Sequence, residues 1–147
     1  VNFTGEVGNL CEITKLKDGK MGIADTLGDD KILSSRPDES TNGELAEVEV
    51  NCNTGGQISV TSLTPDSSDA TNFSTTAGYL KNAFVAENAT DFATPNIELA
   101  NGEGGKTSTI SLNGTAKTLF VHGVASSDNP VPAGNYAFKA TVTITPQ

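Results

Sequence analysis

The sequence predicts an all-β protein, with a two-sheet β-sandwich as the first choice and a β-barrel as the second. Apolar and polar residues alternate with a period of two in most segments, as they do in half-buried strands. Glycine, proline and asparagine pairs typical of turns separate these segments, and no window shows a convincing helical stripe. The 147 residues suit one domain that covers residues 1–147.

The strands expected in the first half of the chain are short. The first covers residues 1–7, where Val1, Phe3 and Val7 share one face that Gly5 interrupts. Two further alternating segments follow it. Their expected inward residues are Val48, Val50, Cys52, Ile58 and Val60.

The second half contains a turn signal and the clearest strand. Residues 76–92 are the best helical candidate, but Gly78 and the Thr and Asn content favour strand and loop. The Asn113-Gly114 pair stands between two alternating segments and predicts a hairpin turn. The last segment covers residues 135–145. Its expected inward face consists of Tyr136, Phe138, Ala140, Val142 and Ile144.

The charge balance excludes some classes of partner. The chain has 18 acidic and nine basic residues and a formal net charge of −9. A nucleic-acid-binding protein needs a basic surface to neutralise phosphates, so no nucleic-acid partner is expected. No apolar run reaches the roughly 18 residues of a membrane-spanning helix, so membrane insertion is not expected.

The sequence offers little for catalysis. His122 is the only histidine and could be a base for a serine or cysteine nucleophile. It stands in a strand that is expected to end at Gly123, which favours an outward polar side chain. No nucleophile elbow, P-loop or dinucleotide motif is present, so neither a catalytic residue nor a cofactor is expected.

The acidic and sulfur-containing side chains give no metal pattern. The carboxylates of Asp25, Asp29 and Asp30 do not match the EF-hand loop, so solvated loop side chains are expected rather than a metal site. The two cysteines, Cys11 and Cys52, would form a disulfide in a secreted protein and remain thiols in a cytosolic one. They form no CxxC pair and no Cys–His cluster, so zinc is not expected.

Three motifs in order carry a family resemblance. The chain opens with the pattern apolar-x-Phe-x-Gly-x-Val over residues 1–7, followed by Cys11 and Ile13. A second cysteine, Cys52, ends an alternating strand, and residues 133–136 (Ala-Gly-Asn-Tyr) precede the last strand. Together these motifs resemble the chaperone–usher pilins, the subunits of fimbriae. The ending is most similar to the archaic, spore-coat-U-like branch.

This resemblance implies an incomplete immunoglobulin-like β-sandwich, the pilin fold, with one disulfide between Cys11 and Cys52. The domain would lack its last strand, which leaves an apolar groove and an unpaired sheet edge. The first and last strands would flank this donor-strand groove. The residues expected to line it are Phe3, Val7, Phe138, Ala140, Val142 and Ile144.

The resemblance also implies partners and a location. A periplasmic chaperone would fill the groove first, and the donor strand of a neighbouring pilin subunit would replace it at the outer-membrane usher. The expected location is an extracellular, cell-surface fimbria reached through the periplasm. The predicted function is a structural subunit of a bacterial pilus that supports adhesion or biofilm formation.

Two features depart from the family pattern and leave alternatives. Classical pilins commonly keep a tyrosine next to the end, whereas this chain ends in residues 145–147 (Thr-Pro-Gln). Pilins also carry a donor extension upstream of the Phe-x-Gly strand, whereas this sequence opens at Val1. The extension is therefore expected to have been removed or moved, or the subunit to be terminal. The alternative function is a tip adhesin or carbohydrate-binding β-sandwich module, with Tyr79, Phe84 and Phe92 as aromatic candidates. A secreted hydrolase ranks last.

Overall fold

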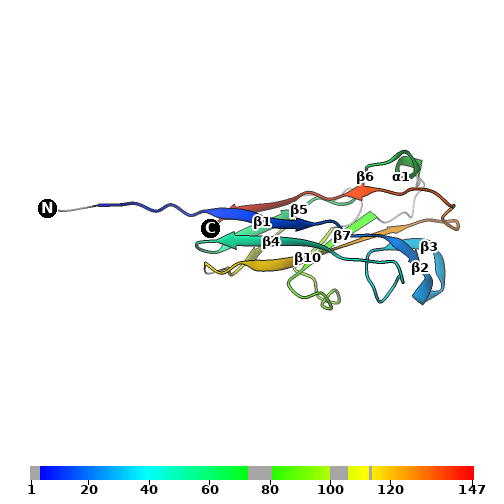
Figure 1. Cartoon of the computed structure of the whole chain (residues 1–147), viewed down its shortest axis with the longest axis horizontal. Coiled ribbons are helices and arrows are strands. Elements are labelled where there is room, and N and C mark those ends of the chain that lie inside the picture. Colours follow the sequence, from blue (N-terminus) through cyan, green and yellow to red (C-terminus); the bar gives the residue numbers. More distant parts are fainter. Residues whose placement is uncertain (1–3, 73–80, 100–105, 113) are drawn as a thin grey trace.

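The strands form two layers that lie face to face in a computed structural model of the chain (Figure 1). The structure describes residues 4–72, 81–99, 106–112 and 114–147. The described elements, in chain order, are β1 (Cys11–Lys17), β2 (Gly22–Ala24), the 3-10 helix η1 (Asp25–Leu27), β3 (Asp29–Ser34), β4 (Ala46–Cys52), β5 (Gly56–Val60), β6 (Thr64–Pro65), α1 (Ser68–Asn72), β7 (Lys81–Ala86), β8 (Ile97–Leu99), β9 (Thr107–Ile110), β10 (Lys117–Ser126), β11 (Phe138–Lys139) and β12 (Val142–Pro146).

The larger layer is organised around the long strand β10. One edge of β10 pairs with β4 and then with β3, and its other edge pairs with β7, all antiparallel. β1 extends this layer beyond β4, β2 extends it beyond β3, and β8 extends it beyond β7. The smaller layer contains β12, β5 and β9, and the short β11–β6 pair continues the β12–β5 ribbon.

The core lies between the two layers, as the alternation of apolar residues predicts. β4 has the burial pattern expected of a strand with one partly exposed face and one buried face. β5 and β10 alternate in the same way over most of their lengths. The buried core residues are Val48, Val50, Cys52, Ile58, Val60, Leu63, Ala83, Val85, Ile97, Ile110, Leu112, Leu119 and Val121.

The strand expected at residues 1–7 is wrong for the part of it that the structure describes. The first strand begins at Cys11, and residues 4–10 are exposed and belong to no strand. They form a tail, and its residues 4–7 extend away from the rest of the chain (Figure 1). Alternation alone predicted a strand here, but a strand also needs a neighbour that accepts its main-chain hydrogen bonds.

The hairpin expected at Asn113-Gly114 is also wrong. The strands on either side of it lie in different layers, because β9 pairs with β5 and β10 pairs with β4. Asn113 itself lies outside the described residues. Gly114 adopts a φ of 74°, which favours glycine, and its N–H donates to the Cys52 carbonyl at 2.9 Å. The turn chemistry was therefore correct, but the connection crosses between layers.

The expectations for the remaining segments largely agree with the structure. In residues 81–92, strand β7 is followed by a loop, as expected, and residues 76–80 lie outside the described part. The last segment keeps its alternation but divides into β11 and β12 around Ala140 and Thr141. Within the described residues, no helix is long and apolar enough to cross a membrane.

Candidate functional site

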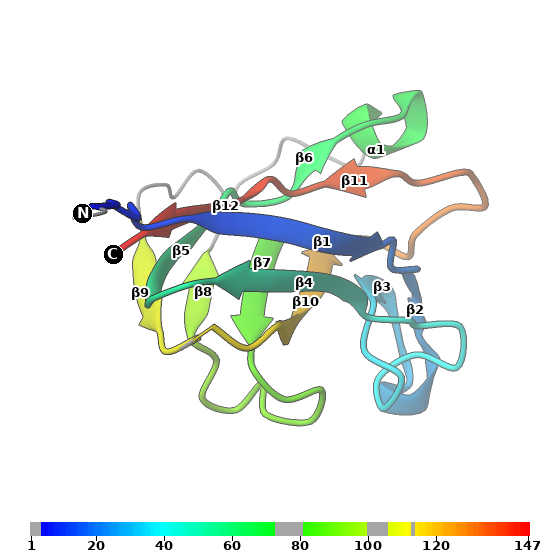
Figure 2. The same ribbon diagram turned by 60° about the vertical axis from the view of Figure 1, so that its left-hand side comes forward.

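A groove separates the open edges of the two layers. β1 pairs only with β4, and β12 pairs only with β5, within the described part of the chain. The two edge strands run side by side, as Figures 1 and 2 both show. Between them lies a cavity of about 850 Å³ that opens to solvent and is lined by residues of β1, β4, β10 and the C-terminal strands. This groove is the candidate functional site.

The β1 wall of the groove carries two exposed apolar side chains. Ile13 is 41% exposed and Leu16 is 71% exposed, although both line the groove. They are three residues apart, so a regular strand would point them to opposite faces. A bulge between Ile13 and Lys15 restores a common face, where Ile13 is opposite Val50 and Leu16 is opposite Val48.

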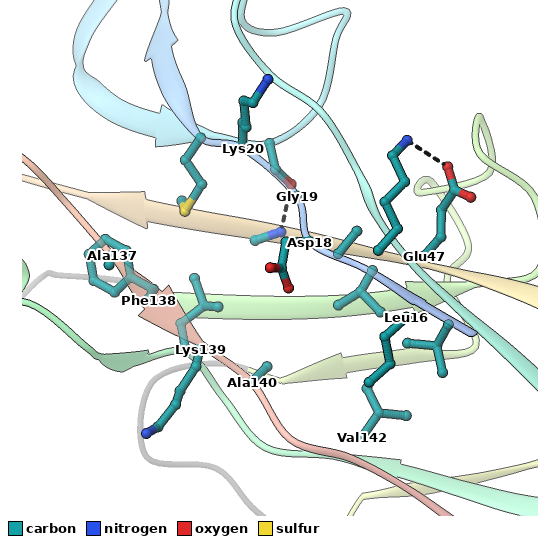
Figure 3. A pocket seen from close by; sticks show the side chains of 18 of the residues that line it. Leu16, Asp18, Gly19, Lys20, Glu47, Ala137, Phe138, Lys139, Ala140 and Val142 are labelled. Atoms are coloured by element: carbon teal, nitrogen blue, oxygen red, sulfur yellow. Dashed lines mark hydrogen bonds and ion pairs between the residues drawn. The ribbon is translucent and has the colours of Figure 1, made fainter. Parts of the chain in front are cut away.

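The opposite wall comes from the C-terminal strands. Phe138, Ala140 and Val142 line the groove, and each is only partly buried. Figure 3 shows Leu16 and Val142 on opposite walls of the same space. Lys139 and Thr141, which alternate with these residues, are exposed. The wall therefore has the apolar alternation of a strand whose inner face is incompletely covered.

The structure brings together three of the six residues that the sequence assigned to the groove. These are Phe138, Ala140 and Val142. Ile144 packs against the main core and does not line the groove, and Val7 is 83% exposed in the tail. Phe3 lies outside the described residues. Val7 is separated from the groove because the segment expected to flank it is not a strand.

Sequence reasoning missed Ile13 and Leu16 as groove residues. Both are apolar and follow Cys11 closely, so the sequence could have identified them as candidates for the groove. Their spacing of three hid the common face, because the bulge that aligns them depends on pairing with β4. The Thr14 hydroxyl donates to Glu49 Oε1 at 2.8 Å and fixes the bulge to the neighbouring strand.

Ion pairs lie along the rim of the groove. Lys17 Nζ is 3.0 Å from Glu47 Oε1, and Lys139 Nζ is 3.2 Å from Asp66 Oδ1. All four residues line the cavity, and Figure 3 draws the Glu47 pair. Exposed pairs of this kind contribute little to stability. They keep the rim polar around an apolar interior, which is typical of a binding groove.

A third ion pair lies just outside the ends of β1 and β4. Lys20 Nζ is 2.6 Å from Glu44 Oε1. The hydrogen bond from Lys20, together with its positive charge, lowers the pKa of the Glu44 carboxyl. The main chains of these two residues also exchange hydrogen bonds, so they tie the segment after β1 to the segment before β4.

The disulfide predicted between Cys11 and Cys52 is confirmed. The two residues face each other across β1 and β4, with 4.1 Å between their Cα atoms. Cys52 is buried in the core, whereas Cys11 is partly exposed at the start of β1. The bond therefore attaches the exposed edge strand to the core.

His122 is buried, although an outward polar side chain was expected. Its side chain is only 4% exposed and stacks on Phe84 with a centroid distance of 5.2 Å. Phe92, from the loop after β7, contacts the imidazole edge-on at 5.4 Å. His122 does point away from the main core, but this loop covers the outer face of the sheet at that point. β10 also continues past Gly123 to Ser126.

The chemistry around His122 suits a structural role. Its Nδ1 is 3.0 Å from Ser35 Oγ, which also accepts the Gly123 N–H at 2.9 Å. Burial, supported by the Arg36 charge, lowers the pKa of His122 to about 3. A general base works best with a pKa near the working pH, so this imidazole is a poor proton acceptor for Ser35.

The other sequence candidates do not form a site in the described residues. Phe92 is buried and Phe84 is partly buried against His122, so neither offers an exposed platform for a sugar. Tyr79 lies outside the described residues. In the described part of the chain, no three His, Cys, Asp or Glu residues gather in a way that could hold a metal ion.

The comparisons with known proteins identify no relative of this chain. No family model, no curated protein and no solved structure matches the chain.

Proposed function

We propose that this protein is a structural subunit of a bacterial surface fibre and that the groove between β1 and β11–β12 accepts a donor strand from a neighbouring subunit. The observation that carries this proposal is the groove itself, which lies between two sheet edges with exposed apolar walls. On this proposal the fold is an incomplete immunoglobulin-like sandwich. The protein has no catalytic role and needs no cofactor.

A β-strand fits the chemistry of the groove. Both flanking strands are edges, and an edge strand offers main-chain donors and acceptors to an added strand. Ile13, Leu16, Phe138 and Val142 supply apolar contacts for alternate side chains of that strand. The added strand would join the two layers and cover side chains that are otherwise exposed.

The tail of a second copy is the proposed donor. Residues 4–7 are exposed and unpaired, so they are free to leave one subunit for another. In the sequence, Val1, Phe3 and Val7 alternate with polar residues, as a strand entering an apolar groove requires. Seven extended residues span roughly 23 Å, which is also the length of a seven-residue strand such as β1.

Assembly by this contact would produce a filament. The donor surface and the groove are different parts of the chain, so the interface is heterologous and does not close on itself. We propose a periplasmic chaperone and an outer-membrane usher as assembly partners and the cell surface as the final location. A chaperone would protect the open groove until a neighbouring subunit fills it.

The proposal is tested with a donor peptide. A variant that lacks residues 1–7 is mixed with a peptide of those seven residues, and the melting temperature is measured. A ligand that binds only the folded state stabilises it by about 2.7 kcal/mol at a hundredfold excess over Kd. We therefore expect the melting temperature to rise by several degrees.

Two leucine variants provide matched controls for that experiment. Leu16→Lys places a charge on the groove wall and should abolish the effect of the peptide. Leu27→Lys changes another exposed leucine, in η1 and outside the groove, and should leave the effect intact. An unchanged melting temperature in the parent protein, or equal responses from both variants, would count against the donor groove.

A further inference from the structure

One side chain fixes the base of the tail to the larger layer. Asn53 Oδ1 accepts the Leu10 N–H at 2.8 Å, and Asn53 Nδ2 donates to the Gly8 carbonyl at 2.9 Å. The Asn53 main-chain N–H donates to the Leu10 carbonyl at 3.0 Å. A side-chain amide has both a donor and an acceptor, so Asn53 can hold main-chain groups on both sides of Asn9.

The base of the tail is also attached to the smaller layer. Asn9 Nδ2 donates to the Gln147 main-chain oxygen at 2.7 Å. The Thr54 hydroxyl donates to the same oxygen at 2.8 Å, and the Gln147 N–H donates to the Gly55 carbonyl at 3.0 Å. Residues 8–10 are therefore held between the end of β4 and the end of β12, next to the disulfide at Cys11.

The tail changes character at Gly8. Residues 4–7 are exposed, and the structure records no hydrogen bond between them and the other described residues. Glycine adopts a wider range of main-chain conformations than any other residue, so the main chain can turn at Gly8. Downstream of Gly8, the hydrogen bonds to Asn53 and Gln147 begin.

We propose that Asn53 is a positioning residue that makes residues 8–10 a rigid joint and places the hinge of the tail at Gly8. The joint fixes the point at which the upstream residues leave the body of the protein, so movement of the tail is confined to the hinge. In a fibre, an inference that rests on the proposed function, this joint limits the movement of each subunit relative to the next. The resulting fibre is stiff, because the hinge between subunits is short.

The joint is tested in monomeric protein by NMR relaxation. The Phe3→Ala, Val7→Ala background removes two of the three apolar donor side chains and is expected to keep the chain monomeric. We expect backbone order parameters of about 0.85 at Asn9 and Leu10 and values below about 0.6 upstream of Gly8. Asn53→Ala should lower the values at Asn9 and Leu10 into the flexible range and leave those of β4 unchanged.

Two further variants sharpen this test. Asn53→Asp keeps an acceptor for the Leu10 N–H but loses the donor to Gly8, so Leu10 should stay more ordered than in Asn53→Ala. Asn129→Ala changes an exposed asparagine elsewhere and should have no effect on the tail. Flexible residues 9–10 in the parent protein, or unchanged order in Asn53→Ala, would overturn the proposal.

Fibres give a second readout. In the unsubstituted background, Asn53→Ala fibres should bend more strongly in electron micrographs, with a persistence length at least twofold shorter. Equally stiff fibres would overturn the role of the joint in assembly. If the parent protein forms no fibres, this result counts against the proposed function alone. The order parameters of the monomer test the joint independently.

Discussion

At the scale of single residues, His122 shows how burial decides the properties of a side chain. The imidazole lies between Phe84 and Phe92, and Arg36 stands over the Phe92 ring at 5.9 Å. Desolvation disfavours the charged imidazolium, and the nearby Arg36 charge adds to this effect. The neutral ring is therefore part of a small apolar cluster on the outer face of the larger layer, with Leu45, Ala86 and Phe92.

His122 should make the folded protein sensitive to acid. Its pKa is lowered to about 3 in the folded state, whereas the pKa of an unfolded histidine lies near 6.5. Between these two values the unfolded state binds more protons, so stability falls as the pH decreases from 6.5 towards 3. Each pH unit in this window lowers the folding equilibrium constant by up to about tenfold.

Urea unfolding at pH 7, 5.5 and 4.5 measures this effect. The carboxylates also titrate in acid, so the comparison is made with His122→Gln, which removes the imidazole and leaves them in place. We expect the variant to be less stable at pH 7 and to lose less stability on acidification. Parallel pH profiles for the two proteins would show that His122 does not contribute.

At the scale of elements, β1 depends on its neighbour and on the disulfide. It pairs with β4 alone, and all of its residues except Cys11 are exposed. Little burial holds this strand in place, so it is attached by its pairing with β4 and by the cross-link at its first residue. The strand also forms one wall of the groove, and its position therefore matters for any donor strand.

Loss of the disulfide should destabilise the protein substantially. The bond joins residues that are 41 positions apart, and the chain-entropy model assigns roughly 4 kcal/mol to a loop of this length. The Cys11→Ala, Cys52→Ala double variant should lose about 2–5 kcal/mol of unfolding free energy in urea. Reduction of the parent protein should produce a similar loss, and an unchanged urea midpoint in both cases would refute the prediction.

At the scale of the whole molecule, the tail and the groove are the two parts of the chain that the proposed assembly would bring together. The tail leaves the body at the end where β12 finishes (Figure 1). The exposed apolar residues of the described chain include Val7 and Leu10 in the tail and Ile13 and Leu16 in β1. Association between copies would cover residues of both sets.

Self-association should therefore depend on the apolar face of the tail. Size-exclusion chromatography with light scattering should show polymers for the full chain and a folded monomer when residues 1–7 are deleted. Phe3→Ala with Val7→Ala should behave like the deletion. Asn2→Ala with Thr4→Ala changes the alternate positions and should behave like the parent. Polymers that persist after the deletion would require a different interface.

The sequence by itself determined the features that depend on local chemistry. Alternation correctly gave the all-β class and the inward faces of β4 and β5, because neighbouring side chains in a strand point to opposite sides. The same alternation predicted that Phe138 and Val142 lie on one face of the last segment. With two cysteines, any internal disulfide had to join Cys11 to Cys52.

Which strand edges remain open, and what covers each face of a sheet, depends on contacts between distant segments. Val7 alternates like a strand residue but has no partner strand, and His122 points outward from the core yet is buried by a distant loop. Gly114 lies in a turn between layers, and the bulge opposite Glu49 turns Leu16 towards the groove. Each of these outcomes depends on pairing between segments far apart in the chain, which a local pattern of residues does not encode.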